Sequence, residues 1–180
     1  RMSEYLQGAL VNLLLPLGNS FRLPETNTSQ ELLLVGGGVG IAPMLYLGQC
    51  LAEKGFKPNF LLGARSKNDL LQLSSFQEYG NVNCTTEDGS YGEKGFVTNH
   101  TIWNELNISK IYTCGPKPMM QAVAKIAHDK QIECEASLEN TMACGFGVCL
   151  CCVEDTKDKG NICVCTEGPV FNTKELKWID

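Results

Sequence analysis

Short apolar runs alternate with longer amphipathic segments along most of the chain. Five of the apolar runs predict buried strands, at residues 32–35, 58–64, 82–86, 110–114 and 133–138. Four intervening segments carry apolar residues at helical spacing, which predicts helices at 41–54, 70–79, 97–106 and 116–130. Strands that alternate with helices are typical of a parallel sheet with helices on both faces. The pattern therefore predicts an α/β fold with a doubly wound, parallel, five-stranded sheet.

The two ends of the chain do not follow this alternation. Residues 9–17 read as a strand and a turn, and residues 23–29 form a polar segment that is typical of a linker. Because the chain opens in mid-pattern, we expect it to be cut from something longer. Residues 144–180 are too few for an independent core, so we expect a small appendage to the α/β domain.

The composition narrows the class of protein. Of the 180 residues, 43% are hydrophobic, and the net charge is −5 with no run of basic residues. A nucleic-acid partner is therefore not expected. No apolar stretch approaches the roughly 20 residues that a membrane helix needs, so we expect no membrane association. Many thiols without a secretory signal favour a reducing, cytoplasmic location.

Six of the ten cysteines fall between Cys144 and Cys165. Cys144, Cys149 and Cys152 reproduce the C-x4-C-x2-C spacing by which plant-type ferredoxins bind a [2Fe–2S] cluster, and a fourth cysteine follows further on. Glycines between the first two cysteines allow the backbone to turn its N–H groups toward the sulfurs. The spacing therefore predicts an iron–sulfur cluster in a small C-terminal subdomain.

Three other interpretations of the cysteines were weighed. Disulfides need an oxidising compartment and are typical of domains with too little core. Structural zinc is the stronger rival, since Cys149 and Cys152 form a C-x2-C pair, but Cys163 and Cys165 have only one residue between them. Unligated buried thiols are the simplest interpretation, and we accept it for the three cysteines that are isolated along the chain: Cys50, Cys84 and Cys134.

Two turns are candidates for nucleotide binding. Gly-Gly-Gly-Val-Gly-Ile-Ala-Pro at 36–43 joins the first predicted strand to the first helix, where backbone N–H groups can meet a pyrophosphate. The second strand ends in Gly-Ala-Arg-Ser at 63–66, without the acidic residue that holds a ribose in the Rossmann fingerprint, so a plain packing turn stays open as an alternative. Thr-Cys-Gly-Pro at 113–116 follows the fourth strand at the same edge of the sheet, which favours a nucleotide crevice.

Taken together, these motifs resemble the ferredoxin reductase family. The residues that carry the resemblance are the glycine run at 36–43 and Cys-Gly-Pro-Lys-Pro-Met-Met at 114–120. Met-Ala-Cys-Gly-Phe-Gly-Val-Cys at 142–149 and Val-Cys-Thr-Glu-Gly-Pro-Val-Phe at 164–171 resemble one branch, the electron-transfer subunits of NAD-dependent dihydroorotate dehydrogenases. The match extends over nearly the whole chain.

The resemblance implies an oxidoreductase that works as part of a complex. Electrons from dihydroorotate, oxidised in a separate catalytic flavin subunit, would pass through [2Fe–2S] and FAD to NAD in pyrimidine biosynthesis. The family implies a heterotetramer with that subunit. Phe146, Val148 and Leu150 form an apolar lip that would face this partner, with packing on the α/β domain as the alternative. Two alternatives stay open: the reductase subunit of another flavin and iron–sulfur complex, of the NADH-dependent ferredoxin:NADP oxidoreductase or sulfhydrogenase type, or a zinc-stabilised nucleotide-binding module without redox activity.

The resemblance also implies roles for single residues, none of them a general base. The cluster ligands would be Cys144, Cys149, Cys152 and Cys165, whereas Cys163 and Cys151 would not ligate. Arg65 and Lys67 offer charge for a 2′-phosphate, but the family implies NAD rather than NADP. The expected nucleotide contacts are Gly38, Val39, Gly40, Cys114, Gly115 and, for ribose or phosphate, Asp88.

The resemblance further implies three parts of the chain. The family carries an N-terminal β-barrel that holds FAD, and residues 1–27 resemble only its end, where Leu-Pro-Leu-Gly-Asn-Ser-Phe at 15–21 matches Gly-Pro-Leu-Gly-Asn-Gly-Phe. Residues 28–138 would bind NAD, and residues 139–180 would hold the cluster. FAD would bind mostly through the missing barrel, so we expect the chain to be N-terminally truncated.

Overall fold

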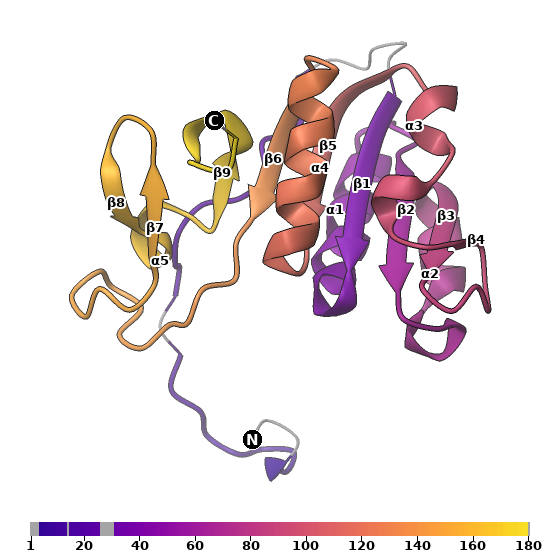
Figure 1. Ribbon diagram of the computed structural model, residues 1–180. Coiled ribbons are helices and arrows are strands. Elements are labelled where there is room, and N and C mark those ends of the chain that lie inside the picture. Colours follow the sequence, from indigo (N-terminus) through magenta and orange to yellow (C-terminus); the bar gives the residue numbers. More distant parts are fainter. Residues whose placement is uncertain (1–3, 14, 26–30, 180) are drawn as a thin grey trace.

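A twisted, mostly parallel sheet forms the centre of the computed structural model, which describes residues 4–13, 15–25 and 31–179 (Figure 1). The sheet has seven strands in the order β4-β3-β2-β1-β5-β6-β9. Every neighbouring pair is parallel except β6 and β9. In chain order the strands are β1 Glu31–Gly37, β2 Asn59–Ala64, β3 Asn81–Thr86, β4 Glu93–Lys94, β5 Ile108–Cys114, β6 Glu133–Ser137 and β9 Val170–Asn172.

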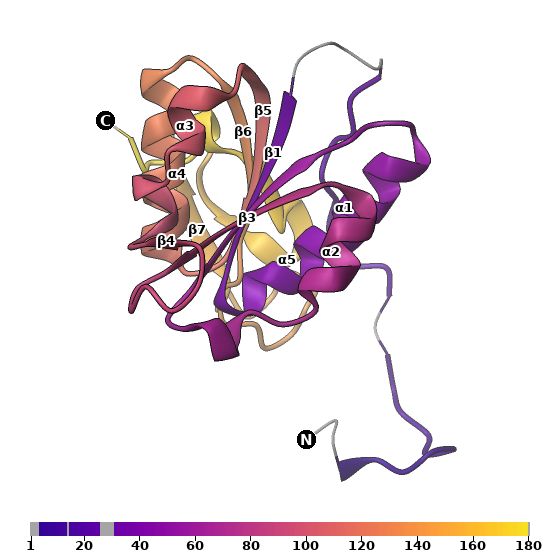
Figure 2. The ribbon, with the colours of Figure 1, turned by 90° about the vertical axis from the view of Figure 1, so that its right-hand side faces the viewer.

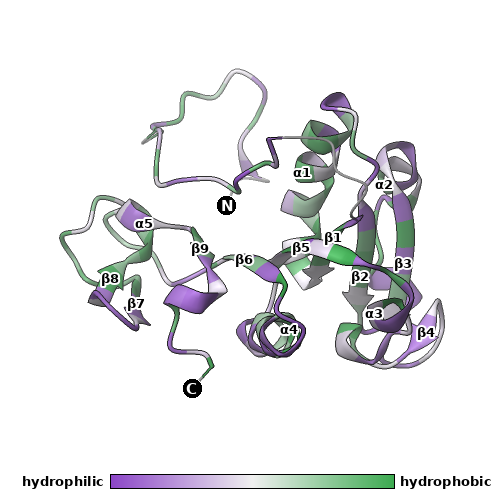
Figure 3. Cartoon of the chain, turned by 90° about the horizontal axis from the view of Figure 1, so that it is seen from above, coloured by the Kyte–Doolittle hydropathy of each residue, from purple (hydrophilic) through white to green (hydrophobic). Residues whose placement is uncertain are grey.

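Helices cover both faces of this sheet. In Figures 2 and 3, α1 and α2 lie on one face and α3 and α4 on the other. Alternate residues of β1 serve the two cores: Leu32 and Leu34 pack on the α1 and α2 side, and Leu33 and Val35 on the α3 and α4 side. The α-helices are α1 Ile41–Glu53, α2 Leu73–Tyr79, α3 Ile102–Glu105, α4 Lys117–Asp129 and α5 Val164–Glu167, and the 3₁₀ helices are η2 Gly38–Gly40, η3 Lys67–Asp69, η4 Val97–Asn99 and η5 Thr173–Glu175.

All five predicted strands are present, as β1, β2, β3, β5 and β6, and the doubly wound α/β class is confirmed. The count of five is too low because β4 and β9 extend the two edges. β4 has two residues and β9 has three, too short for a periodic pattern to reveal. The predicted helix at 97–106 is split into η4 and α3, where the Nδ1 atom of His100 accepts the Ile102 N–H at 2.9 Å.

The strand predicted at 9–17 is wrong for the residues that the structure describes there. Leu10 is 99% exposed, and Leu13 is 73% exposed. The described part of the chain supplies no partner strand for this segment, and strand N–H and C=O groups need one. The boundary expected between residues 27 and 28 lies outside the described residues.

The cysteine-bearing segment packs on the β6 end of the sheet. It contains a hairpin of β7, Val153–Thr156, and β8, Gly160–Cys163, followed by α5 and β9. Its buried residues share one core with α4 and β6: Met120, Ala136, Leu138, Cys152, Ile162, Val164, Cys165, Phe171 and Leu176. The segment therefore takes much of its core from the α/β domain, in keeping with its small size. Among the described helices, none is long and apolar enough to cross a bilayer.

A buried carboxylate fastens this segment to α4. Glu154 on β7 is 6% exposed, and its oxygens accept hydrogen bonds from Lys117 Nζ at 2.8 Å, Trp178 Nε1 at 3.1 Å and Asn140 Nδ2 at 3.2 Å. Burial alone would raise the pKa of Glu154, but the donors, Lys117 first, outweigh burial and lower it. Glu154 therefore stabilises the junction as a carboxylate.

We expect Glu154→Gln to lower the free energy of unfolding by about 2 kcal/mol at pH 7, because its amide cannot accept from all of these donors. The lowered pKa of Glu154 determines how its contribution to the free energy of unfolding depends on pH. Stabilisation is complete above the ordinary value of 4.5 and is lost as pH falls through the lowered value in the folded state, so the two proteins converge in acid. Urea unfolding at neutral and acidic pH measures both effects.

Asp155→Asn is the matched control. Asp155 is the next residue of β7 and pairs with Lys177 at 3.0 Å, but both side chains are 50% exposed. The exposed pair contributes at most about 1 kcal/mol, and we expect no comparable loss. Equal losses in the two variants would contradict the role assigned to Glu154.

Candidate functional site

A cavity of about 840 Å³ opens at the carboxyl ends of the parallel strands. This is the edge at which open α/β sheets bind ligands, and the volume lies in the range of small-molecule and cofactor sites. Its walls come from the turns after β1, β2 and β3 and from the first turn of α4, including Gly38, Val39, Arg65, Glu87, Pro116 and Met119. Sequence and fold thus place a nucleotide-sized crevice where the glycine run ends.

The two predicted turns meet at this edge. Gly36 of β1 lies opposite Cys114 of β5 in the parallel ladder, so both strands end together. A Cβ atom at Gly40 would lie 2.3 Å from the carbonyl oxygen of Cys114, so only glycine allows the two turns to approach this closely. At Gly38 a Cβ atom would meet nothing within 4 Å, because this residue faces the open cavity.

The structure separates the expected nucleotide contacts into two groups. Gly38 and Val39 line the cavity. Gly40, Cys114 and Gly115 pack on one another outside the lining, and burial raises the pKa of the half-buried Cys114 thiol. The Cys114 sulfur is therefore a neutral packing group in this structure.

Asp88 lies beside the cavity rather than in its lining. Its Oδ1 accepts hydrogen bonds from the backbone N–H of Ser90 at 2.9 Å and from the Ser90 hydroxyl at 2.6 Å, which lower the pKa of Asp88. The neighbouring Glu87 does line the cavity, as Arg65 does. The sequence led to Asp88, but spacing does not show which of the two adjacent carboxylates lines the cavity.

Other lining residues carried no sequence signal. Phe96 and Met119 add apolar surface to the cavity. Thr85, the next-to-last residue of β3, also belongs to the lining, and its buried hydroxyl has no hydrogen-bond partner among the described residues. Lys67 is not part of the lining: its ammonium lies 5.7 Å from the centre of the Tyr91 ring, and its backbone N–H donates to Ser90.

The cysteine loop surrounds its first sulfur with backbone donors. The N–H groups of Val148 and Cys149 each lie 3.4 Å from Cys144 Sγ. These donors, Cys149 first and then Phe146, lower the pKa of Cys144 to about 6. Cys144 is thereby prepared as a thiolate, the form that binds metal.

A second sulfur is prepared in the same way on the other side of the loop. The backbone N–H of Cys165 lies 3.4 Å from Cys152 Sγ and is the main cause of the lowered pKa of Cys152. The thiol of Cys165 also bonds to Cys152, as the thiol of Cys149 does to Cys144. Cys163 is a further neighbour of Cys152, since burial and the nearby Cys152 sulfur together raise the pKa of Cys163.

Thiols beside Cys144 and beside Cys152 would suit a [2Fe–2S] cluster, which takes two protein ligands on each of its two irons. Within the described part of the chain, no three His, Cys, Asp or Glu side chains converge on a position for a single metal ion. The cysteines of this segment are therefore the residues that would hold such a cluster.

The remaining two cysteines of the run differ from each other. Cys151 is exposed, and Cys163 is half-buried, with its Sγ 3.8 Å from the carbonyl oxygen of Gly147. Beside them, the lip of Phe146, Val148 and Leu150 is 60–72% exposed in side chains that carry no charge. The cysteine loop therefore presents an apolar surface to its surroundings.

Comparison with known proteins agrees with both halves of this geometry. Residues 139–177 match the family described as the iron–sulfur cluster binding domain of dihydroorotate dehydrogenase B, and residues 34–125 match the oxidoreductase NAD-binding domain. The chain is 39% identical over 179 residues to a protein of Shouchella clausii and 41% identical over 177 residues to one of Listeria monocytogenes. Both are named dihydroorotate dehydrogenase B (NAD(+)), electron transfer subunit; the alignments cover 98% and 97% of this chain and 68% and 69% of the relatives.

The chain belongs to the family of dihydroorotate dehydrogenase B electron-transfer subunits. The resemblance noted in the sequence is thereby confirmed, together with the class of oxidoreductase electron-transfer subunit. The family name implies a partner catalytic subunit. A solved structure described as the NADH-dependent reduced ferredoxin-NADP oxidoreductase is also similar, with 30% identity and a TM-score of 0.81, over 93% of this chain and 60% of that one. It supports the ferredoxin reductase-like fold.

Two adjacent carboxylates, one in the cavity lining and one beside it, are expected to differ in their effect on nucleotide affinity. We expect Glu87→Gln to weaken NADH binding about tenfold, or about 1.4 kcal/mol, since it removes a charged acceptor from the lining. Asp88→Asn should change the affinity less, because that side chain is turned to Ser90. Calorimetric or fluorescence titration with NADH measures both. A larger loss of NADH affinity in Asp88→Asn than in Glu87→Gln would show that Asp88 is the nucleotide contact.

Proposed function

We propose that this chain relays electrons between a dihydroorotate-oxidising flavin subunit and NAD, with its cysteine loop holding a [2Fe–2S] cluster. The observation that carries the proposal is a loop whose backbone N–H groups lie 3.4 Å from Cys144 Sγ and Cys152 Sγ, packed on the same α/β domain as the nucleotide cavity. Iron–sulfur clusters supply one-electron transfer, whereas nicotinamide takes a hydride, so a flavin is needed between the two.

The residues of the chain would bind and position these groups rather than move protons. The backbone donors to Cys144 and Cys152 favour thiolates and compensate negative charge at the sulfurs. At the cavity, Gly38 and Val39 precede α1, and the free N–H groups of this turn would receive the pyrophosphate of NAD. Arg65 and Glu87 would contact the ribose and phosphate groups.

The partner and the location follow the same proposal. The exposed lip of Phe146, Val148 and Leu150 would dock on the catalytic flavin subunit, and two copies of each chain would form a heterotetramer. FAD would be held mostly by the N-terminal β-barrel of the family, of which residues 1–27 would be the end. Residues 28–138 would be the NAD-binding unit, and residues 139–180 the cluster unit. All ten thiols are free, which supports a reducing, cytoplasmic compartment.

The ligand set is tested by single serine substitutions. We expect Cys165→Ser to lose most of its iron, its visible absorption and its EPR signal, because one iron loses a thiolate. Cys151→Ser is the matched control, since the Cys151 side chain is exposed and pairs with none of the ligands. Iron content and EPR of anaerobically reconstituted, dithionite-reduced protein measure the effect.

Two outcomes would contradict the assignment. Loss of the EPR signal in Cys163→Ser, with the signal kept in Cys165→Ser, would make Cys163 the fourth ligand in place of Cys165. A colourless wild-type protein that carries stoichiometric zinc would exclude the cluster and leave the zinc-stabilised nucleotide-binding module.

A second function is supported by the similarity to the ferredoxin–NADP oxidoreductase structure. A reductase subunit of such a complex would use the same cavity and a cluster site of the same kind. Reduction of the cluster by the dihydroorotate-oxidising subunit and dihydroorotate distinguishes the two, since only the first function predicts it.

A further inference from the structure

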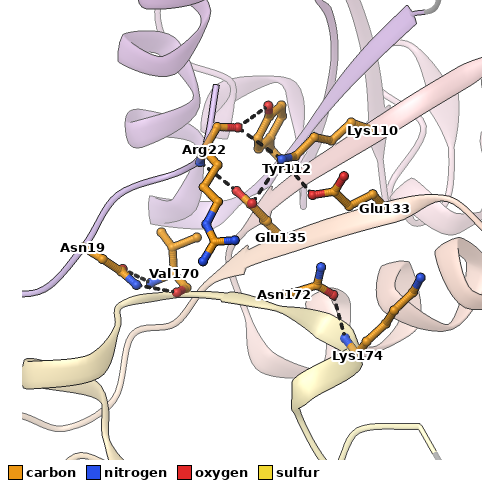
Figure 4. A network of polar contacts seen from close by, with 9 residues as sticks. All are labelled: Asn19, Arg22, Lys110, Tyr112, Glu133, Glu135, Val170, Asn172 and Lys174. Carbon is orange, nitrogen blue, oxygen red and sulfur yellow. Dashed lines mark hydrogen bonds and ion pairs between the residues drawn. The ribbon is translucent and has the colours of Figure 1, made fainter. Parts of the chain in front are cut away.

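An asparagine far from the cysteines in sequence holds the loop that follows Cys165. The Nδ2 group of Asn19 donates to the carbonyl oxygens of Glu167 at 3.0 Å and Val170 at 2.9 Å, and its Oδ1 accepts the Val170 N–H at 2.9 Å. The backbone N–H of Asn19 donates to the Gly168 carbonyl at 2.6 Å. Figure 4 shows Asn19 reaching Val170 across the end of the sheet. Every bond of this set falls within five residues of Cys165.

These bonds satisfy groups that the short helix α5 leaves open. The carbonyl of Glu167 belongs to the last turn of α5, where no helical N–H reaches it. Cys165 is the second residue of that helix, and its backbone N–H is the donor to Cys152 Sγ. Asn19 therefore fixes the C-terminal end of the same four-residue helix that brings the two sulfurs together.

The neighbour of Asn19 requires the same close approach. A Cβ atom at Gly18 would lie 2.0 Å from the carbonyl oxygen of Gly168, and Gly18 has a φ of +67°. Only glycine allows this contact. The backbone of the segment is thus pressed directly on the loop, and the Asn19 side chain completes the junction.

The segment is itself anchored to the sheet a few residues later. The N–H of Arg22 donates to Glu135 at 2.9 Å, and the carbonyl of Arg22 accepts from Tyr112 at 2.9 Å and Lys110 at 3.1 Å (Figure 4). Glu135 and Lys110 are buried or nearly so, and they pair at 3.0 Å. Asn19 is therefore held by β5 and β6 at one end while it holds the Cys165 loop at the other.

We propose that Asn19 is a positioning residue for the iron–sulfur cluster, acting through the loop 167–170 on Cys165. The proposal rests on the function proposed above, in which Cys165 is a ligand. Hydrogen-bonded groups behind metal ligands orient them, and their loss lowers metal affinity about 10–100-fold. Asn19 would thus control both how firmly the cluster is retained and the electronic environment of the iron bound by Cys152 and Cys165.

The test compares two variants with a matched control. Asn19→Asp keeps the size of the side chain but places an oxygen against two carbonyl oxygens, and Asn19→Ala removes all side-chain bonds. Asn172→Ala is the control, because Asn172 lies two residues beyond Val170 and its side chain, among the residues that the structure describes, accepts only the Lys174 N–H, at 3.0 Å. The measurements on cluster-loaded protein are iron release to a chelator, the EPR spectrum and the midpoint potential of the cluster.

We expect both Asn19 variants to release iron about tenfold faster than the wild type, with changed EPR g-values and a shifted midpoint potential. Asn172→Ala should match the wild type in all three. Release rates, spectra and potentials of the Asn19 variants equal to those of Asn172→Ala would overturn the proposal. If Asn19→Ala does not fold, Asn19→Asp decides alone. Retention of the cluster by Cys165→Ser would instead overturn the ligand set, so the two failures are distinguishable.

Discussion

The buried carboxylate of Glu154 is the contact on which the relation between the two sites depends. Residues 139–180 are too few to fold around a core of their own, so they share one with α4 and β6. Glu154 is taken out of water at this junction and is stable there only because donors from three other parts of the chain meet it. The Glu154 side chain therefore joins the β7–β8 hairpin, the first turn of α4 and the C-terminal segment.

The helix α4 connects this junction to the nucleotide cavity. Pro116 and Met119, at its start, line the nucleotide cavity, whereas Lys117 binds Glu154 and Met120 packs in the core below the cysteines. A single rigid element thus separates the two sites, with one side turned to each. A chain whose task is electron relay needs its redox groups held at fixed separation, and the helix supplies that constraint without a catalytic acid or base.

The features that the sequence could predict are those with a local signal. Buried parallel strands are continuous apolar runs, so all five were found, and both nucleotide turns were placed at one edge because parallel strands end together. β9 was missed because its three residues pair with β6, more than thirty positions earlier. Glu87 and Asp88 differ only in which way the loop turns them. Asn19 belongs to the 15–21 match with the family, but its contact with the Cys165 loop, like the contacts of Glu154, is distant along the chain and gave no signal.

The choice between Cys163 and Cys165 shows how far spacing alone can go. Both follow the C-x4-C-x2-C run at similar distance, and only the family resemblance favoured Cys165 in the sequence. In the structure, Cys163 ends β8 with its sulfur toward the Gly147 carbonyl, a contact that a thiol can make as a donor but a thiolate cannot. Cys165 instead lies in α5, with its N–H on Cys152 and its helix end fixed by Asn19. Because Cys163 also lies beside Cys152, the choice of Cys165 depends on its backbone N–H to that sulfur and on the Gly147 contact of Cys163.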